Sequence, residues 1–344
     1  MKYNDNKETS DNLERTYDMA FESVYKIICE NVKNDQLDRD FNLPQENNES
    51  VHWAPGAMDG VYIYHLAHSA ADKETLSRMG KAIDEASEGN FEQAEQSFLE
   101  LTDASRAISL VDDIQRYIID NKDELDLDNL FSFAITVVTE SAHVECVKVG
   151  LEILELFDTS QEEIRDAIGN IALYDEFTIF ALWCMRHWND GNDKVFKTAK
   201  EVHGWGRIHA IEIIEPDTLE IKQWLLTEGI YNDVMSAYSA LTCWNKSDAE
   251  SILFGKPTSA EYKGLAGLID GLLDEGPISG ISELDNREQI LLRFLEIARD
   301  YDLTAEEYDV IHTIKRWADN DKDNKMLAVA DKAREVLESS KRGQ

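Results

Sequence analysis

The strongest constraint on the fold is a run of short amphipathic segments between Val202 and Trp244. Three segments follow one another there, VHGWGRIHAIEII, EPDTLEIKQWLLTEG and IYNDVMSAYSALTCW, and turns of only a few residues join them. Apolar residues recur within each segment at helical spacing, and a helix this short cannot bury its apolar face alone. The succession therefore predicts an all-α chain in which each helix stacks against its neighbours.

The same pattern continues through the more apolar region from Leu130 to Trp188. Its first segment, LFSFAITVVTES, is rich in β-branched and aromatic residues, but no strand-like alternation follows that would supply partner strands, so a helix is favoured. A chain of 344 residues exceeds one compact core, which indicates two domains or one elongated repeat array. We predict a right-handed α-α superhelix, a HEAT/TPR-like solenoid of stacked antiparallel helix pairs. Acidic helix hairpins are expected in residues 1–129 and the repeats in residues 130–344, unless one continuous solenoid spans both.

Several helix ends are marked by residues with known terminal preferences. Gly89 is expected to end a helix that begins near Leu76, because glycine adopts the left-handed conformation common at helix C-termini. Asp158-Thr159-Ser160 is a predicted N-terminal cap for the helix that follows it. Pro216 ends the preceding helix and Asp217 is expected to cap the next one.

The amino-acid composition limits the kinds of partner that this chain is expected to bind. The formal net charge of -35 argues against binding to nucleic acid or to an anionic membrane, both of which need a basic surface, and favours a cationic partner. No run of about 18 apolar residues is present, and the polar N-terminus lacks the apolar core of a secretory signal. The four cysteines stand singly, without a CxxC pair. We therefore expect a cytoplasmic protein without a cofactor.

One segment carries a candidate metal site. VHWAPGAMDGVYIYHLAHSAAD gathers four residues of metal-binding type: His52, Asp59, His65 and His68. On a helix, His65 and His68 share one face, and a ligand from the preceding loop would complete three nitrogen and oxygen donors. A bare HxxH is a weak motif, however. The alternative is that Pro55-Gly56 starts a helix whose aromatic residues pack against the first helix of the chain.

Two resemblances to repeat families support the stacked-helix interpretation. The segment EGNFEQAEQSFLEL resembles the turn between the helices of a tetratricopeptide-like hairpin. The stretch GWGRIHA, together with LLTEG and NDVMSAY, resembles HEAT-like repeats and an uncharacterised bacterial family of HEAT-like proteins over about 70 residues. The resemblance implies an α-solenoid and carries over no catalytic residues.

The opening stretch is also the predicted working surface, because lysines and arginines bring it close to charge balance within an acidic chain. We predict that its concave face binds a protein or peptide through five residues: Trp205, Arg207, His209, Asn232 and Tyr238. The alternative for Arg207 and His209 is that they only satisfy carbonyls and carboxylates between repeats. A more specific hypothesis is that the acidic surface neutralises a basic partner, such as a toxin nuclease, as an immunity protein does.

Two enzyme classes remain as alternatives. The sequence has no GxSxG, GxxxxGK[ST], GxGxxG after a strand or HExxH motif, so the common hydrolase and nucleotide sites lack support. A HEAT-like DNA glycosylase would need a basic groove, which the net charge opposes. A terpene cyclase would use Asp112-Asp113 and an Asn/Ser/Glu motif at Asn232, Asp233 and Ser236, but Ala240 replaces its glutamate, and missing ligands hold a divalent ion poorly. We favour a non-enzymatic scaffold.

Overall fold

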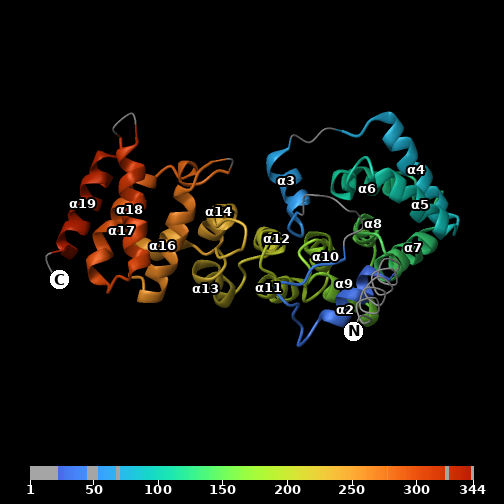
Figure 1. The fold of residues 1–344 in the computed structure, drawn as a ribbon, viewed down its shortest axis with the longest axis horizontal. Coiled ribbons are helices and arrows are strands. Elements are labelled where there is room, and N and C mark those ends of the chain that lie inside the picture. The colour runs from blue at the N-terminus through green and yellow to red at the C-terminus, as the bar shows by residue number, and fades with distance from the viewer. Residues whose placement is uncertain (1–21, 45–52, 67–69, 277, 322–324, 342–344) are drawn as a thin grey trace, which may run out of the picture. The chain divides into compact units, whose positions relative to one another are not determined.

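The computed structural model describes residues 22–44, 53–66, 70–276, 278–321 and 325–341. These residues form eighteen α-helices and three short 3-10 helices, and the only β-type pairing within them is an isolated bridge between Lys33 and Gln36 (Figure 1). The prediction of an all-α chain is confirmed. Within the described part, no helix combines the length and the apolar character that a membrane crossing requires.

The chain divides into two compact units, Met1–Ala210 and Ile211–Gln344, and the division falls inside helix α12 (Trp205–Ile213). The boundary predicted at residues 129 and 130 lies inside α7 (Leu127–Glu140), in the first unit. The acidic stretch before it is a turn between α6 and α7, and helices on its two sides pack together, α4 with α7 and α5 with α8. A change in composition at this point reflects solvent exposure rather than a domain boundary.

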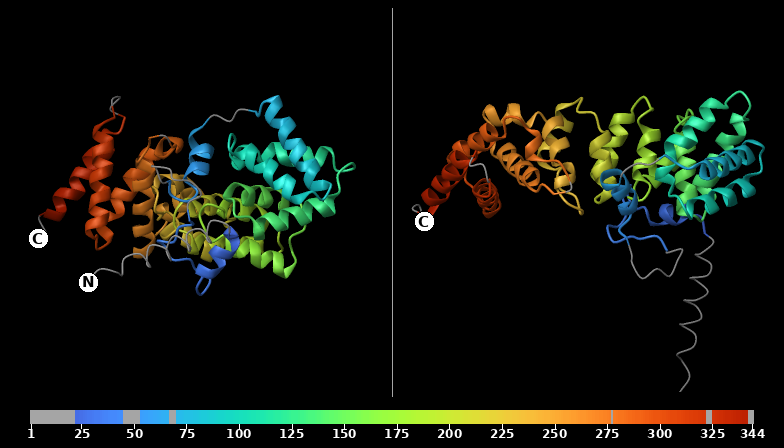
Figure 2. Two further views of the ribbon diagram at one scale, coloured as in Figure 1. Left: turned by 45° about the vertical axis from the view of Figure 1, so that its right-hand side comes forward. Right: turned by 90° about the horizontal axis from the view of Figure 1, so that it is seen from above.

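The N-terminal unit is built from neighbouring helices joined by short turns. Its remaining elements are α2 (Val24–Asn31), α3 (Ala57–His65), α4 (Lys73–Ser87), α5 (Phe91–Thr102), η1 (Ala107–Ser109), α6 (Val111–Asp120), α8 (Val144–Leu154), α9 (Glu162–Ile171), α10 (Thr178–Met185) and α11 (Gly191–Glu201). The pairs α4–α5, α7–α8 and α9–α10 lie in direct contact (Figure 2).

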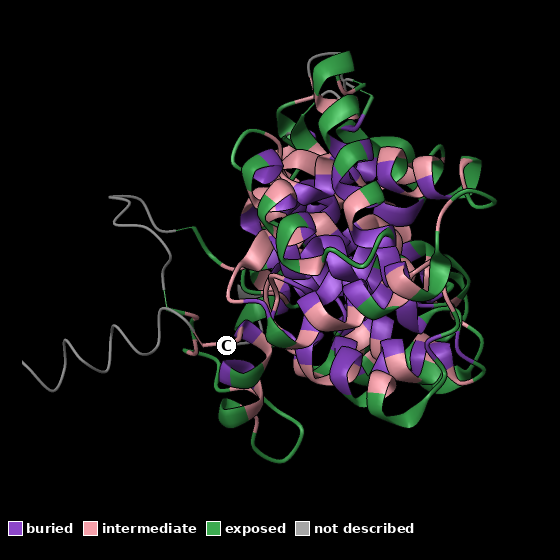
Figure 3. Ribbon diagram, turned by 90° about the vertical axis from the view of Figure 1, so that its right-hand side faces the viewer, coloured by how far each residue is buried: buried purple, intermediate pink, exposed green. Residues whose placement is uncertain are grey.

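Helix α8 is the centre of this unit. It packs against α5, α6, α7, α10 and η1, and every residue from Cys146 to Leu154 is buried. A helix that is buried on all sides normally carries apolar residues all round. Helix α8 instead includes Lys148 and Glu152 in its buried surface, so these two charges require an explanation. Figure 3 shows the buried residues on the helix faces that point to the interior and the exposed residues on the outer faces.

The C-terminal unit repeats the same construction. Its elements are α13 (Leu219–Thr227), α14 (Ala237–Lys246), α15 (Ala249–Phe254), α16 (Ser259–Leu273), η2 (Ile281–Glu283), α17 (Arg287–Ile297), η3 (Ala298–Asp300), α18 (Ala305–Asp319) and α19 (Leu327–Lys341). Helix α16 contacts α13, α14 and α18, and α18 contacts α19. In the core, the Tyr262 ring stacks on Phe294 and Tyr301 with centroid distances of 4.7 and 4.3 Å.

One of the predicted helix ends is confirmed and two are wrong. Gly89 follows α4 with a φ of 82°, so its predicted role is confirmed. The cap predicted at residues 158–160 is wrong, because α9 begins after Gln161, whereas Asp158 accepts a hydrogen bond from the Ser160 amide. The Thr218 side chain, rather than that of Asp217, caps α13. The three helices predicted between Val202 and Trp244 are confirmed as α12, α13 and α14.

Candidate partner-binding grooves

A buried ionic cluster organises the N-terminal unit. The Lys148 side chain is fully buried, and its ammonium Nζ lies 2.7 Å from the Asp59 carboxylate, 2.9 Å from Glu145 and 2.5 Å from Glu176. Three carboxylates thus use the three donors of one ammonium. Although burial opposes the charge, these carboxylates together raise the pKa of Lys148 above its ordinary value. The lysine is therefore charged in the folded protein.

A second cation and two backbone amides complete the cluster. Arg106 lies 3.0 Å from Asp59 and 2.9 Å from Glu145. The second Glu145 oxygen accepts from the Ala107 amide at 2.8 Å, and the second Glu176 oxygen accepts from the Gly56 amide at 2.6 Å. Every carboxylate oxygen in the cluster has a donor. We call Asp59, Arg106, Glu145, Lys148 and Glu176 the ionic cluster; it joins α3, η1, α8 and the turn before α10.

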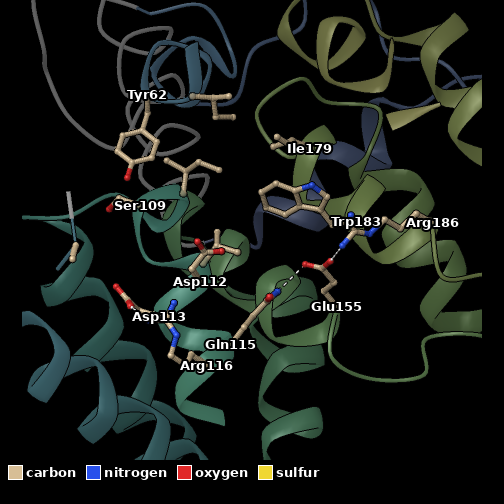
Figure 4. Close-up of a pocket in the computed structure, with 14 residues that line it drawn as sticks. Tyr62, Ser109, Asp112, Asp113, Gln115, Arg116, Glu155, Ile179, Trp183 and Arg186 are labelled. Carbon is tan, nitrogen blue, oxygen red and sulfur yellow. Dashed lines mark hydrogen bonds and ion pairs between the residues drawn. The ribbon is translucent and has the colours of Figure 1, made fainter. Parts of the chain in front are cut away.

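The N-terminal groove lies beside this cluster, between α3, the η1–α6 segment and α10, and has a volume of about 550 Å³. Figure 4 shows the Trp183 indole and the Asp112 carboxylate projecting into it, with Tyr62 at its edge. Two of its carboxylates are already paired, Asp113 with Arg116 and Glu155 with Arg186. Asp112 has no ion-pair partner among the described residues, so one carboxylate is available beside an aromatic surface.

The predicted surface residues on α12 are buried. Trp205, Arg207 and His209 are only 5, 9 and 3% exposed. The amides of Gly204 and Gly206 donate to the Asp175 carboxylate, which fixes the start of α12. These side chains present little area to a partner, and their role in binding stays a prediction.

The Tyr64 ring of α3 packs against α12. The Tyr64 ring lies 6.0 Å from Trp205 and 6.1 Å from His209 between centroids. A Cβ on Gly60 would fall within 2.5 Å of Trp205 ring atoms, so only glycine allows this approach. The predicted helix start after Pro55-Gly56 is confirmed. Part of the first predicted helix lies outside the described residues, so packing of α3 against it stays a prediction.

Asn232, another predicted contact residue, organises a loop in the C-terminal unit. Its side-chain oxygen accepts hydrogen bonds from the Val234 and Met235 amides at 3.0 and 2.8 Å. The loop between α13 and α14 consequently presents Tyr231, Val234 and Met235 to solvent, with exposures of 48, 37 and 39%. Asn232 therefore positions apolar neighbours. Tyr238, the fifth predicted residue, is half-buried in α14.

The C-terminal groove adjoins this loop. It has a volume of about 690 Å³ and lies between Tyr231, α16 and α18. Its lining includes five carboxylates and one ammonium: Glu228, Asp270, Glu306, Glu307, Asp309 and Lys263. Lys263 pairs with Glu306 at 2.8 Å, and Glu307 caps α18. Burial raises the pKa of Asp270 above its ordinary value. The groove is thus strongly acidic and has an exposed aromatic ring at its edge.

The two candidate metal ligands that the structure describes, Asp59 and His65, do not belong to a metal site. His52 and His68 lie outside the described part, and His65 is exposed at the end of α3. The Asp59 carboxylate is occupied by Lys148 and Arg106. Within the described part, no group of three His, Cys, Asp or Glu side chains has metal-binding geometry. Of the cyclase candidates, Asp112 and Asp113 belong to the N-terminal unit and Asn232, Asp233 and Ser236 to the C-terminal unit.

No protein-family model, curated protein or solved structure matches this chain. The likeness to HEAT and tetratricopeptide repeats therefore remains a resemblance of short segments.

Sequence reasoning missed the ionic cluster, although a signal for it exists. Within the apolar segment VECVKVGLEILELF, the charged residues Glu145, Lys148, Glu152 and Glu155 stand at i, i+3, i+7 and i+10. This spacing places them along one face of a helix. A charged stripe on an otherwise apolar helix indicates buried ion pairs, but the sequence does not reveal partners on other helices.

Proposed function

We propose that this chain is a non-enzymatic helical scaffold that binds a basic protein or peptide through the C-terminal groove. The observation that carries the proposal is the lining of this groove, in which five carboxylates face one ammonium beside the exposed side chains of Tyr231, Val234 and Met235. We further propose that its helix pairs form a HEAT-like, right-handed α-solenoid, which the succession of short paired helices supports.

The two kinds of surface would contribute differently to binding. Unpaired carboxylates such as Asp309 attract a cationic partner and raise its rate of association, an effect that salt weakens. Contact with the apolar loop would supply most of the affinity, because buried aromatic and aliphatic side chains dominate interface energies. The fitting partner is an amphipathic segment with lysine or arginine beside apolar residues. An acidic groove opposes DNA, so the glycosylase alternative gains nothing from it.

The test is a binding titration with a synthetic amphipathic peptide that contains lysine, arginine and leucine. We expect Asp309→Lys to weaken binding at least about tenfold at about 0.15 M salt, because it replaces attraction by repulsion at close range. Asn232→Ala should weaken binding without changing the net charge, because it releases the loop. A matched peptide with glutamate in place of lysine and arginine should not bind.

The control is Glu296→Lys, which makes the same change of charge on the exposed surface of α17, outside the groove lining. It should alter the affinity less than about twofold, since salt screens distant surface charges. Equal weakening by Asp309→Lys and Glu296→Lys would mean that net charge alone attracts the peptide, and the groove would then not be its binding site.

A further inference from the structure

Glu152 is a buried acid that forms no ion pair within the described part of the chain. Its side chain is fully buried, and neither carboxyl oxygen has a hydrogen-bond partner within the described part of the chain. An unpaired buried carboxylate is so costly that such a group takes up a proton instead. Burial, followed by the nearby Glu145 and Asp59 carboxylates, raises the pKa of Glu152 well above its ordinary value. Burial and the missing hydrogen-bond partners therefore both favour the neutral form of Glu152.

A natural partner for Glu152 lies one helical turn away. Lys148 precedes it by four residues on α8, which is the spacing of an intrahelical ion pair. The pair is not formed, because the Lys148 ammonium already donates to Asp59, Glu145 and Glu176. Glu145 shares α8 with the lysine, and Glu176 precedes α10. Asp59 comes from α3, so removal of that helix would open one position on the ammonium.

Helix α3 buries few of its own residues. Only Ala57, Asp59 and Gly60 are buried in it. Its large apolar residues are only partly covered, and Leu66, which follows it, is 54% exposed. Gly60 and Tyr64 pack on Trp205, but a short helix with so few buried residues opens at a lower free-energy cost than the whole unit. Two residues of α3, Tyr62 and Ile63, also line the N-terminal groove, so displacement of α3 would remove one wall of that groove.

We propose that α3 is a displaceable latch on the N-terminal groove, and that Glu152 replaces Asp59 on Lys148 when the latch opens. Asp59 moves into solvent as a carboxylate, Glu152 releases its proton to solvent, and the new carboxylate pairs with the ammonium. The number of carboxylates around Lys148 stays constant and one proton is released. This inference concerns the N-terminal unit and does not depend on peptide binding by the C-terminal groove.

The first test is a double-mutant cycle on the urea unfolding of the N-terminal unit. Glu152→Gln should raise the unfolding midpoint at neutral pH, because the natural protein must take up a proton on Glu152 when it folds and glutamine needs none. Asp59→Asn should lower the midpoint only moderately, since Glu152 ionises in its place. The double variant should lose at least tenfold more in its folding equilibrium constant than the two single changes predict together. Additive losses would contradict the exchange.

The second test uses amide hydrogen exchange and needs only folded variants. The charged groups facing Glu152 are Glu145, Asp59, Lys148 and Glu155, and Arg106 and Glu176 face Lys148. Because opening releases one proton, the opening constant of α3 should rise with pH in the natural protein, approaching about tenfold per pH unit. In Glu152→Gln this rise should vanish and α3 should exchange more slowly. Amides of α16 serve as the internal control. Identical α3 exchange in both proteins would overturn the proposal.

Discussion

We expect Lys148→Met to destabilise the N-terminal unit by about 3–5 kcal/mol, the usual cost of removing one partner from a buried ion pair. The reason is that methionine fills the space of the lysine but leaves Asp59, Glu145 and Glu176 without their shared ammonium. Arg106 alone then faces three carboxylates. Urea unfolding followed by tryptophan fluorescence measures the loss as a shift of the transition of this unit, which contains Trp183, Trp188 and Trp205, whereas Trp224, Trp244 and Trp317 report on the C-terminal unit.

The matched control is Lys197→Met, which removes an exposed lysine paired with Asp35 at 2.8 Å. An exposed ion pair contributes little, so its unfolding curve should nearly overlay that of the natural protein. If Lys148→Met is no more destabilising than this control, the ionic cluster does not hold the unit together.

The second large effect is a loss of stability in acid caused by His209. Burial lowers the pKa of its imidazole to about 4, and its Nε2 has no hydrogen-bond partner among the described residues. The unfolded chain binds this proton near pH 6.5 and the folded chain only near pH 4. The neutral imidazole therefore costs no stability above about pH 6.5. Below that pH the free energy of unfolding falls by about 1.4 kcal/mol per pH unit, and the total loss is about 3 kcal/mol near pH 4.

The measurement compares urea unfolding at about pH 7 and pH 4.5 for the natural protein and for His209→Phe. Phenylalanine keeps the ring contacts with Tyr64 and Trp205 but has no proton to bind. Carboxylates titrate equally in both proteins, so the natural protein should lose about 2–3 kcal/mol more than the variant. Parallel losses would show that His209 is protonated without cost in the folded state.

The sequence predicted the helices well because their signals are local. Helical spacing of apolar residues defined α12, α13 and α14, and Gly89 marked the end of α4. The cap of α13 was misassigned by one residue, since neighbouring Asp and Thr side chains are both good caps in isolation, and α9 begins after Gln161, whose side chain makes no cap hydrogen bond. In the structure, Thr159 instead accepts a hydrogen bond from the distant Trp188 indole.

The candidate site was less predictable, because it depends on contacts between distant residues. Asp59 and Lys148 are 89 positions apart, and no local pattern pairs them. Trp205 was expected on a surface, but Gly60 and Tyr64 cover it. Asn232 was predicted to contact a partner, and in the structure its side-chain oxygen orders its own loop. The acidic lining of the C-terminal groove comes from three places, namely α16, α18 and the loop that follows α13. No local pattern joins them, so only the net charge of the chain indicated an acidic surface.

The most direct test of the central claim is a hydrogen-exchange footprint of the bound amphipathic basic peptide. Binding in the C-terminal groove predicts slower exchange at residues 228–236, in α16 and at the start of α18, and the loss of this protection in Asp309→Lys. Protection confined to the N-terminal unit, or spread evenly over the acidic surface, would contradict the proposed function.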